Sequence, residues 1–420
     1  MTVPRSCIVL DRIPDPPVGG QALRYRQALD ALGALGEVRL LCLSRRPEHS
    51  RHYAVKWLRP EPADSPWRHA AALLGPAVKR RFRDARRSRH LDRLRFDTGD
   101  AIAAMGCDLV LVASAELATY LPPPQTLAVP VIYDAHNVEK VLWGDLGALR
   151  ASLLGPAAKT RFRDRILTGE AALMGGAQQV WACSNADADL LRATYPESSA
   201  EIRVVPNAID TSRFADLRRT VPTHAGPPIL LLTGDFGYLP NLEAGLMLIG
   251  EILPLVRRAA PGCRLVLCGR HPPPAMRAAA AGDPAIIITG EVADVRPWLA
   301  TCDVVVVPLR HGGGTRIKIL EALAAGCPVV STVKGAEGLE VDPDHHLLLA
   351  DTAAAMAEAI VRCLREPVAA AAMGVRGQVL VEARYSWRAN REVVHAAVGA
   401  LLAAPRQIAS ATPTAPVPAP

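Results

Sequence analysis

Residues 302–332 constrain the local fold more tightly than any other stretch of the sequence. The segment "CDVVVVPL" (302–309) is a run of branched apolar residues, the pattern of a strand buried on both faces. Three glycines follow, and "TRIKILEALAAG" (315–326) then has apolar residues at helical spacing, with Thr315 as candidate N-cap. "PVVST" (328–332) is a second strand. Strand, loop, helix and strand predict a βαβ unit, and therefore a parallel sheet.

The predicted loop and helix start carry an unusual charge pattern. Helix N-termini present unpaired N–H groups and favour acidic residues, but Arg316 and Lys318 stand here. Glycines let the backbone approach an anion closely, so the pattern indicates a phosphate or diphosphate site. The alternative is a surface loop in which Lys318 pairs with Glu321, three residues on. The spacing matches neither the P-loop nor the G-x-G-x-x-G dinucleotide fingerprint.

The rest of the chain repeats the alternation of strands and helices. With 420 residues, two domains are expected. We predict two doubly wound α/β domains, at residues 1–210 and 227–385, joined by a polar linker at 211–226. Residues 386–404 form a final helix, for which the N-terminal domain is a candidate packing partner. The Pro/Ala-rich tail, 405–420, is predicted to be disordered.

The nine cysteines are scattered, without a C-x-x-C pair, and mostly lie in apolar runs. They are typical of reduced core residues in a cytosolic protein, and they give no support to a metal site. The N-terminus lacks the pattern of a signal peptide, and no apolar run reaches the roughly 18 residues that a spanning helix needs. The sequence therefore predicts a soluble protein.

Residues 79–95 hold nine Lys/Arg against Asp84 and Asp92, an excess of seven that equals the net charge of the whole chain, +7. One interpretation is a solvated helix face. The other is a basic surface helix attracted to anionic lipid, where each cation contributes about 1 kcal/mol. Nucleic acid is a poorer partner, because no base-stacking aromatic residues are interleaved with the cations.

Several motifs together resemble the retaining group-1 (family 4) glycosyltransferases. The second half matches through "GDFGYLPNLEA" (234–244), "VLCGR" (266–270), residues 288–332 and "GAEGL" (335–339). The first half matches more loosely, through "PPVGGQALRYRQALDALGALGEVRLL" (16–41), "YDAHNVE" (133–139), "CSNADADLL" (183–191) and "VVPNAIDTSRF" (204–214). The resemblance implies the GT-B fold, in which two Rossmann-like domains face each other across a cleft.

The resemblance also implies which residues bind a nucleoside-diphosphate-sugar donor. The second Glu of the family's E-x7-E signature falls at Glu321, which is expected to hold the ribose hydroxyls. The first falls at Gly313, a departure that leaves the donor sugar to backbone N–H groups. A second departure is the absence of a cation from "GDFGYLPN", for which Arg316 and Lys318 are candidate substitutes. The expected donor-binding residues are Gly19, Gly20, Gly234, Arg270, Val292, Gly312, Gly313, Gly314, Thr315 and Glu321.

In the first half, His136 follows a strand end and is the candidate for the family's active-site histidine, the alternative being an ordinary loop histidine. Glu139 and Asp134 are weaker candidates. Gly19 and Gly20 lie in a loop that the family directs at the donor phosphates, although an ordinary turn explains them equally well. Asn207 lies near the domain junction, with a structural role as its simplest explanation.

The expected reaction transfers a sugar to an acceptor hydroxyl with retention of configuration. Arg316, Lys318 and His136 are the expected catalytic groups, and no cofactor or metal is required. The rivals are a nucleotide-sugar 2-epimerase and a non-catalytic nucleotide-sugar-binding protein. The expected partners are the donor, a glycan or glycolipid acceptor, and an anionic membrane surface contacted through 79–95. By analogy, the protein is expected in the cytoplasm, peripheral at the inner face of the cytoplasmic membrane, in envelope-glycan or exopolysaccharide synthesis.

Overall fold

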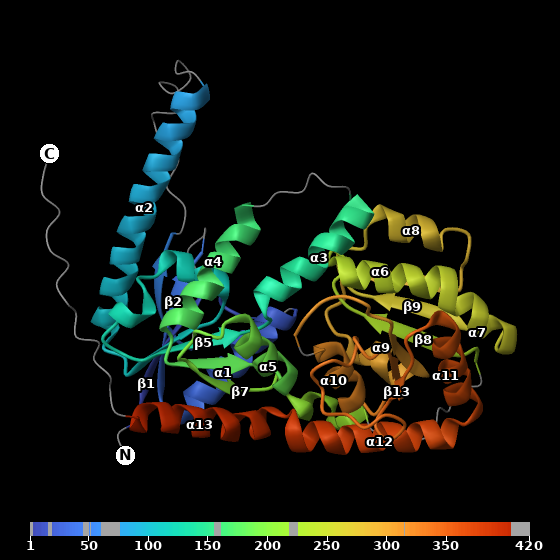
Figure 1. Ribbon diagram of the computed structural model, residues 1–420. Coiled ribbons are helices and arrows are strands. Elements are labelled where there is room, and N and C mark those ends of the chain that lie inside the picture. The colour runs from blue at the N-terminus through green and yellow to red at the C-terminus, as the bar shows by residue number, and fades with distance from the viewer. Residues whose placement is uncertain are drawn as a thin grey trace, which may run out of the picture.

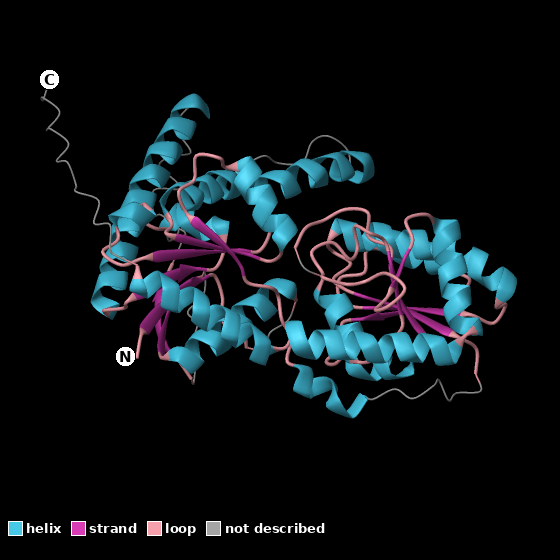
Figure 2. Cartoon of the chain, turned by 60° about the horizontal axis from the view of Figure 1, so that its bottom comes forward, coloured by secondary structure: helices cyan, strands magenta, loops and turns pink. Residues whose placement is uncertain are grey.

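The computed structural model describes residues 3–15, 19–44, 50, 52–59, 76–154, 161–217, 226–314 and 316–404. Two parallel sheets form the centres of two α/β domains, which lie side by side in Figure 1. The fold class predicted from the sequence is confirmed. Short strands of Val, Leu and Ile run through both sheets, with helices on both faces (Figure 2).

The N-terminal sheet has seven strands in the order β3-β2-β1-β4-β5-β6-β7, all parallel. In chain order they are β1 (Arg5–Leu10), β2 (Glu37–Leu43), β3 (Ala54–Leu58), β4 (Leu109–Val112), β5 (Val131–Ala135), β6 (Gln179–Ala182) and β7 (Glu201–Val204). The helices are α1 (Gly20–Leu35), α2 (Pro76–Met105), α3 (Glu139–Leu154), α4 (Arg161–Gly176) and α5 (Asn185–Thr194), with 3₁₀ turns at η3 (Ala115–Tyr120), η4 (Pro124–Thr126) and η5 (Thr211–Leu217).

The C-terminal sheet has six strands in the order β10-β9-β8-β11-β12-β13, again all parallel. They are β8 (Ile229–Thr233), β9 (Arg264–Cys268), β10 (Ile286–Gly290), β11 (Val304–Val307), β12 (Val329–Ser331) and β13 (Leu348–Leu349). The helices are α6 (Leu239–Met247), α7 (Leu253–Ala259), α8 (Pro274–Ala280), α9 (Arg296–Thr301), α10 (Ile317–Ala324), α11 (Ala353–Arg365), α12 (Pro367–Arg384) and α13 (Trp387–Ala403).

Helices α12 and α13 run along one side of both domains (Figure 1). Val394, Ala397 and Val398 of α13 belong to the apolar cluster on one face of the N-terminal sheet, and Arg391 forms an ion pair with Asp30 of α1 at 2.6 Å. The final helix of the chain therefore packs on the first domain. The segment read as a linker is partly ordered by packing, because Phe214 of η5 is buried in the C-terminal core.

The helix predicted at 241–262 begins earlier, at Leu239, and a π-helical turn at Leu248–Ile252 joins α6 to α7. By length and composition alone this segment, Leu239–Ala259, could cross a membrane, because an 18-residue window of it has a mean hydropathy of 1.4. However, 56% of that window is buried inside the protein, as expected of a core helix. The sequence analysis, which found no apolar run of this length, overlooked it because polar residues interrupt the segment.

The basic segment 79–95 lies on α2, whose N-terminal part extends beyond the body of its domain (Figure 1). The side chains of residues 79–88 lie outside the described part of the structure, as do Thr315 and the tail 405–420. All nine cysteines are described, and each is buried and free of a disulfide.

Candidate functional site

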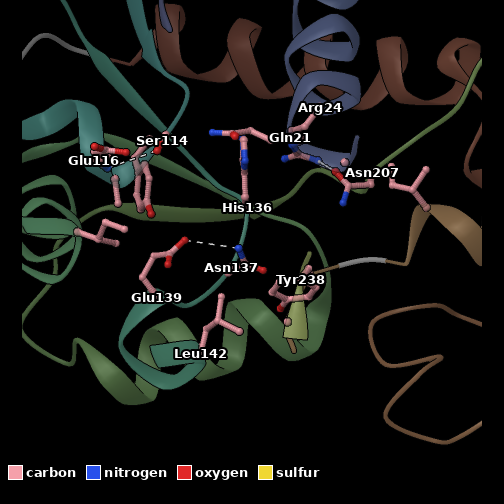
Figure 3. A pocket seen from close by; sticks show the side chains of 17 residues that line it. Gln21, Arg24, Ser114, Glu116, His136, Asn137, Glu139, Leu142, Asn207 and Tyr238 are labelled. Carbon is pink, nitrogen blue, oxygen red and sulfur yellow. Dashed lines mark hydrogen bonds between the residues drawn. The ribbon is translucent and has the colours of Figure 1, made fainter. Parts of the chain in front are cut away.

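A cavity of about 380 Å³ lies between the two domains, at the carboxyl ends of the strands (Figure 3). Open parallel sheets place ligand sites at this edge. The first domain contributes most of the wall, and the second domain closes it with Tyr238, the glycine loop and the start of α10. The lining residues are Gly20, Gln21, Arg24, Ser114, Ala115, Glu116, Tyr133, His136, Asn137, Glu139, Leu142, Ile166, Asn207, Tyr238, Gly313, Gly314 and Ile317.

The glycine loop, defined here as Gly312–Gly314, packs directly against the turn that follows β5. A Cβ atom on Gly313 would stand 3.1 Å from Asn137 Oδ1. On Gly314 it would stand 2.9 Å from both Asn137 Oδ1 and the His136 carbonyl oxygen, and this residue has a φ of +73°. A Cβ atom on Gly314 would overlap the backbone of the first domain, whereas one on Gly313 would require only a small shift of the Asn137 side chain. The departure from the family signature at Gly313 is thus a close contact between domains.

The side chain of Arg316 does not point into a solvated cleft. Arg316 is the N-cap residue of α10, and its side chain is buried. Its guanidinium donates hydrogen bonds to the carbonyl oxygens of Gly312 and Gly313, each at 2.8 Å. Nε is buried without a partner in the described part of the chain, where no carboxylate pairs with Arg316. Arg316 therefore shapes the glycine loop and adds a buried positive charge beneath it.

Lys318 is also partly shielded from solvent. It is half-buried, and its ammonium group donates a hydrogen bond to Asn241 Oδ1 at 2.5 Å. It also lies 3.1 Å from where a Cβ atom on Gly234 would stand. Burial, and then the proximity of Arg316, lower the pKa of Lys318 to about 7. An anion bound beside it would restore the charged form.

Arg270 reaches the same region from the end of β9. Its Nε lies 2.9 Å from Asp235 Oδ2, and Nη2 lies 2.7 Å from where a Cβ atom on Gly19 would stand, across the cleft. The segment "GDFGYLPN", which has no cation of its own, therefore receives Arg270 and Lys318 from elsewhere in the chain. The structure brings Gly19, Gly234, Arg270 and Lys318 to one side of the cleft.

Glu321 lies one turn beyond Lys318 on α10, half-buried, and burial raises its pKa to about 7. Val292 follows β10 and packs against the C-terminal core. Neither residue lines the cavity. Thr315, the remaining predicted donor residue, is outside the described residues. Over the part of the chain that is described, no group of three or more His, Cys, Asp or Glu side chains is arranged to hold a metal ion.

The first-domain side of the cavity is organised by a buried ion pair. Arg24 of α1 binds Asp134 of β5 at 2.6 Å, and it also donates to Val205 O at 2.6 Å and Asn207 Oδ1 at 3.1 Å. Burial alone would raise the pKa of Asp134, but Arg24 and then His136 outweigh it and lower the pKa to about 2. His136 Nε2 lies 3.5 Å from Asp134 Oδ2, longer than a usual hydrogen bond. Asp134 therefore orients the candidate histidine without binding it tightly.

Glu139 begins α3, and its carboxylate accepts hydrogen bonds from Trp143 Nε1 at 3.1 Å and Asn137 Nδ2 at 3.4 Å. Burial, and then Glu170, raise its pKa. Glu170 of α4 is fully buried and accepts hydrogen bonds from the backbone nitrogens of Glu139 and Lys140 and from the Tyr195 hydroxyl. A carboxylate that is distant in the sequence thus caps the start of α3.

Sequence reasoning missed Arg24, Glu116 and Glu170. Arg24 lies within α1 and Glu170 within α4. Charged residues in helices are usually exposed to solvent, so neither sequence position indicates a buried role. Only the fold brings them to the strand ends. The one available signal was that Asp134 lies at the end of a buried strand, where a carboxylate requires a buried cation.

Comparisons with known families agree with the geometry. A family described as "Glycosyl transferases group 1" matches residues 227–366, and one described as "Glycosyltransferase Family 4" matches residues 18–213. The two matches together span both domains and meet near η5.

Two curated proteins are similar in sequence. A GDP-mannose-dependent alpha-(1-6)-phosphatidylinositol monomannoside mannosyltransferase of Mycobacterium tuberculosis is 26% identical over 60% of this chain and 73% of its own length. A GDP-mannose-dependent monoacylated alpha-(1-6)-phosphatidylinositol monomannoside mannosyltransferase of Corynebacterium glutamicum is 30% identical over 33% of this chain and 39% of its own length. The alignment thus spans well under half of the length of the Corynebacterium glutamicum protein.

Solved structures share the fold across nearly the whole chain. Sucrose-phosphate synthase from Thermosynechococcus elongatus superposes with a TM-score of 0.69 at 22% identity, covering 95% of this chain and 99% of that one. Anabaena HepE in complex with UDP-glucose superposes with a TM-score of 0.63 at 13% identity, covering 94% and 99%. At these identities the likeness concerns the fold.

Proposed function

Because the chain belongs to the group-1 (family 4) glycosyltransferases, we propose that it transfers a sugar from a nucleoside-diphosphate donor to an acceptor hydroxyl with retention of configuration. The observation that carries the proposal is the position of the glycine loop. Its backbone meets the His136–Asn137 turn at the cavity, and two cations without a carboxylate partner among the described residues, Arg316 and Lys318, lie next to it.

The proposed mechanism is a displacement on one face of the donor sugar. The diphosphate lies beside the glycine loop, Arg270 and Lys318, which offset the negative charge that grows on the leaving group. The departing phosphate helps to deprotonate the acceptor hydroxyl. His136 contacts the donor sugar from the first domain, and backbone N–H groups of the glycine loop replace the carboxylate that Gly313 lacks. Glu321 holds the ribose hydroxyls. No metal takes part in this scheme.

The donor is tested by thermal denaturation with a panel of UDP-, GDP- and ADP-sugars, because a ligand of the native state raises the melting temperature. GDP-mannose heads the panel, since both curated relatives depend on it. Incubation of the best donor without acceptor then separates a transferase, which gives only slow hydrolysis, from an epimerase, which converts the sugar. NMR of the product's anomeric carbon tests retention. A panel with no stabilising nucleotide sugar would contradict the proposal.

We also propose that the protein works in envelope-glycan or exopolysaccharide synthesis, in the cytoplasm at the inner face of the cytoplasmic membrane. The basic segment of α2 supplies the attraction to anionic lipid, which salt screens over about 8–10 Å at physiological ionic strength. The test replaces Arg80, Arg81, Arg83, Arg86 and Arg87 by Gln and measures co-sedimentation with phosphatidylglycerol vesicles at low and high salt.

The matched control for the vesicle test replaces five exposed arginines of the C-terminal half: Arg258, Arg277, Arg365, Arg384 and Arg388. Both variants lose the same charge. We expect only the α2 variant to lose binding, with donor binding intact in both. If the two variants sediment equally, the net charge of the protein, and not α2, determines vesicle binding. The proposed membrane role of α2 would then be refuted.

A further inference from the structure

Glu139 lines the cavity and has no role in the mechanism proposed above. Its two hydrogen bonds come from Trp143 and Asn137, which are uncharged. No cation of the described residues forms an ion pair with it. Burial raises its pKa, and the negative charge of Glu170 raises it further. A carboxylate on a cavity wall without a cation partner has unused capacity to accept hydrogen bonds.

The helix that Glu139 begins has no room for an anion at its start. Helix N-termini normally attract phosphates through their unpaired N–H groups. In α3, however, the backbone nitrogens of Glu139 and Lys140 already donate to Glu170 Oε1 and Oε2, at 2.7 and 3.0 Å. This side of the cavity therefore presents one carboxylate on its surface and a second one behind it.

Charge divides the cavity into two ends. Figure 3 shows Glu116 and Glu139 on one side of His136, and Arg24, Asn207 and Tyr238 on the other. The glycine loop with Arg316 and Lys318 comes from the second domain. Glu116 is partly offset by Arg165, whose Nη2 lies 3.5 Å away. The doubly negative diphosphate belongs beside the cations, so the acidic end is left for the second substrate.

We propose that Glu139 accepts a hydrogen bond from a hydroxyl of the acceptor, and that the acceptor group bound there is an uncharged sugar ring or polyol rather than a phosphorylated one. This inference rests on the transferase function proposed above. A carboxylate accepts strong hydrogen bonds from hydroxyl groups. A phosphate at the same place would face Glu139 with Glu170 behind it, and no cation of the described residues forms an ion pair with either carboxylate. Like charges repel strongly in a partly buried site.

Matched pairs of acceptors test the proposal: myo-inositol against inositol 1-phosphate, and methyl α-mannoside against its 6-phosphate. With the donor that stabilises the protein most, we expect the neutral member of each pair to be preferred at least tenfold in kcat/KM. Glu139→Gln keeps the shape but removes the charge, and it should lower the preference to about threefold or less. Glu197→Gln, an exposed substitution of the same kind, should leave it unchanged. A wild-type preference for the phosphates, or an unchanged ratio in Glu139→Gln, would overturn the proposal.

Hydrolysis of the donor in the absence of acceptor separates the two levels of inference. If the wild-type protein hydrolyses the donor but Glu139→Gln does not change the choice of acceptor, only the proposed role of Glu139 is refuted. Absence of both hydrolysis and donor binding refutes the transferase function itself. We expect Glu139→Gln to show a raised KM for the neutral acceptors.

Trp143 provides a direct readout that does not need turnover, because its indole N–H donates to Glu139. Its ¹H–¹⁵N resonance, assigned with Trp143→Phe, should titrate with a midpoint above the ordinary pKa of Glu, and this titration should vanish in Glu139→Gln. Neutral polyols should shift the resonance and their phosphates should not. If no neutral compound moves it at millimolar concentration, the acceptor does not contact Glu139 and the proposal fails.

Discussion

The two walls of the cavity are built in different ways. The second-domain wall comes largely from one stretch of sequence, in which the glycine loop, Arg316 and Lys318 lie within seven residues. The first-domain wall depends on residues from four distant elements: Arg24 of α1 and Glu139 of α3 line the cavity, and Asp134 of β5 and Glu170 of α4 lie buried behind them. The first kind of site leaves a readable motif. The second kind leaves isolated charges whose partners only the fold supplies.

The largest effect is expected from breaking the ion pair that holds the first-domain wall. Asp134→Ala leaves Arg24 buried without its partner, which costs about 3–5 kcal/mol of stability. The midpoint of urea unfolding should fall accordingly. Asp97→Ala is the control, because its ion pair with Arg93 is exposed and contributes at most about 1 kcal/mol. Similar losses in the two variants would mean that the wall does not depend on this pair.

The next largest effect concerns the close contact between the walls. Gly314→Ala places a Cβ atom 2.9 Å from His136 O at a φ of +73°. Backbone strain of about 1–2 kcal/mol and displacement of the loop should reduce turnover about a hundredfold, as a misplacement near 1 Å does. Gly33→Ala, on an open face of α1, should be neutral or slightly stabilising. Normal turnover of Gly314→Ala would show that the contact is dispensable.

These contrasts also explain what could be predicted from sequence. Buried strands such as Val304–Val307 and Val329–Ser331 are runs of branched residues, so the two sheets and the βαβ unit of the donor side followed directly. The edge strand β3 is only half-buried and α12 is rich in Ala and Gly, so neither has a strong pattern. Local motifs identified Arg316 and Lys318 as site residues. They could not predict that these side chains are shielded from solvent, because the shielding depends on Asn241 and on the opposite domain.

A moderate effect should appear in the pH dependence of donor binding. Burial and Arg316 lower the pKa of Lys318 to about 7, so the free protein holds it charged below that pH and neutral above it. The diphosphate binds the charged form, and its affinity should therefore fall as the pH rises from about 7 to 9, by up to tenfold per unit. Calorimetric titration of the nucleoside diphosphate measures it.

Lys318→Met is the control for the pH profile. It should bind more weakly at pH 6 and lose the decline between pH 7 and 9, because no group is left to deprotonate beside the phosphates. Any change in the ionisation of the nucleotide is common to both proteins. Parallel profiles in the two would show that Lys318 does not contact the diphosphate, and the donor wall would then depend on Arg270 and the loop.

The smallest effect tests whether the first-domain wall is tuned from a distance. Glu170→Gln keeps an acceptor for one of the two α3 backbone nitrogens, leaves the other facing an amide nitrogen and removes a negative charge, so the cost in stability should be about 1–3 kcal/mol. Because Glu170 raises the pKa of Glu139, the midpoint of the Trp143 indole titration should move to lower pH. Tyr195→Phe, which removes only the hydroxyl that donates to Glu170, should leave that midpoint in place. If the midpoint also stays in place in Glu170→Gln, burial alone raises the pKa of Glu139. The negative charge of Glu170 then has no effect on that pKa.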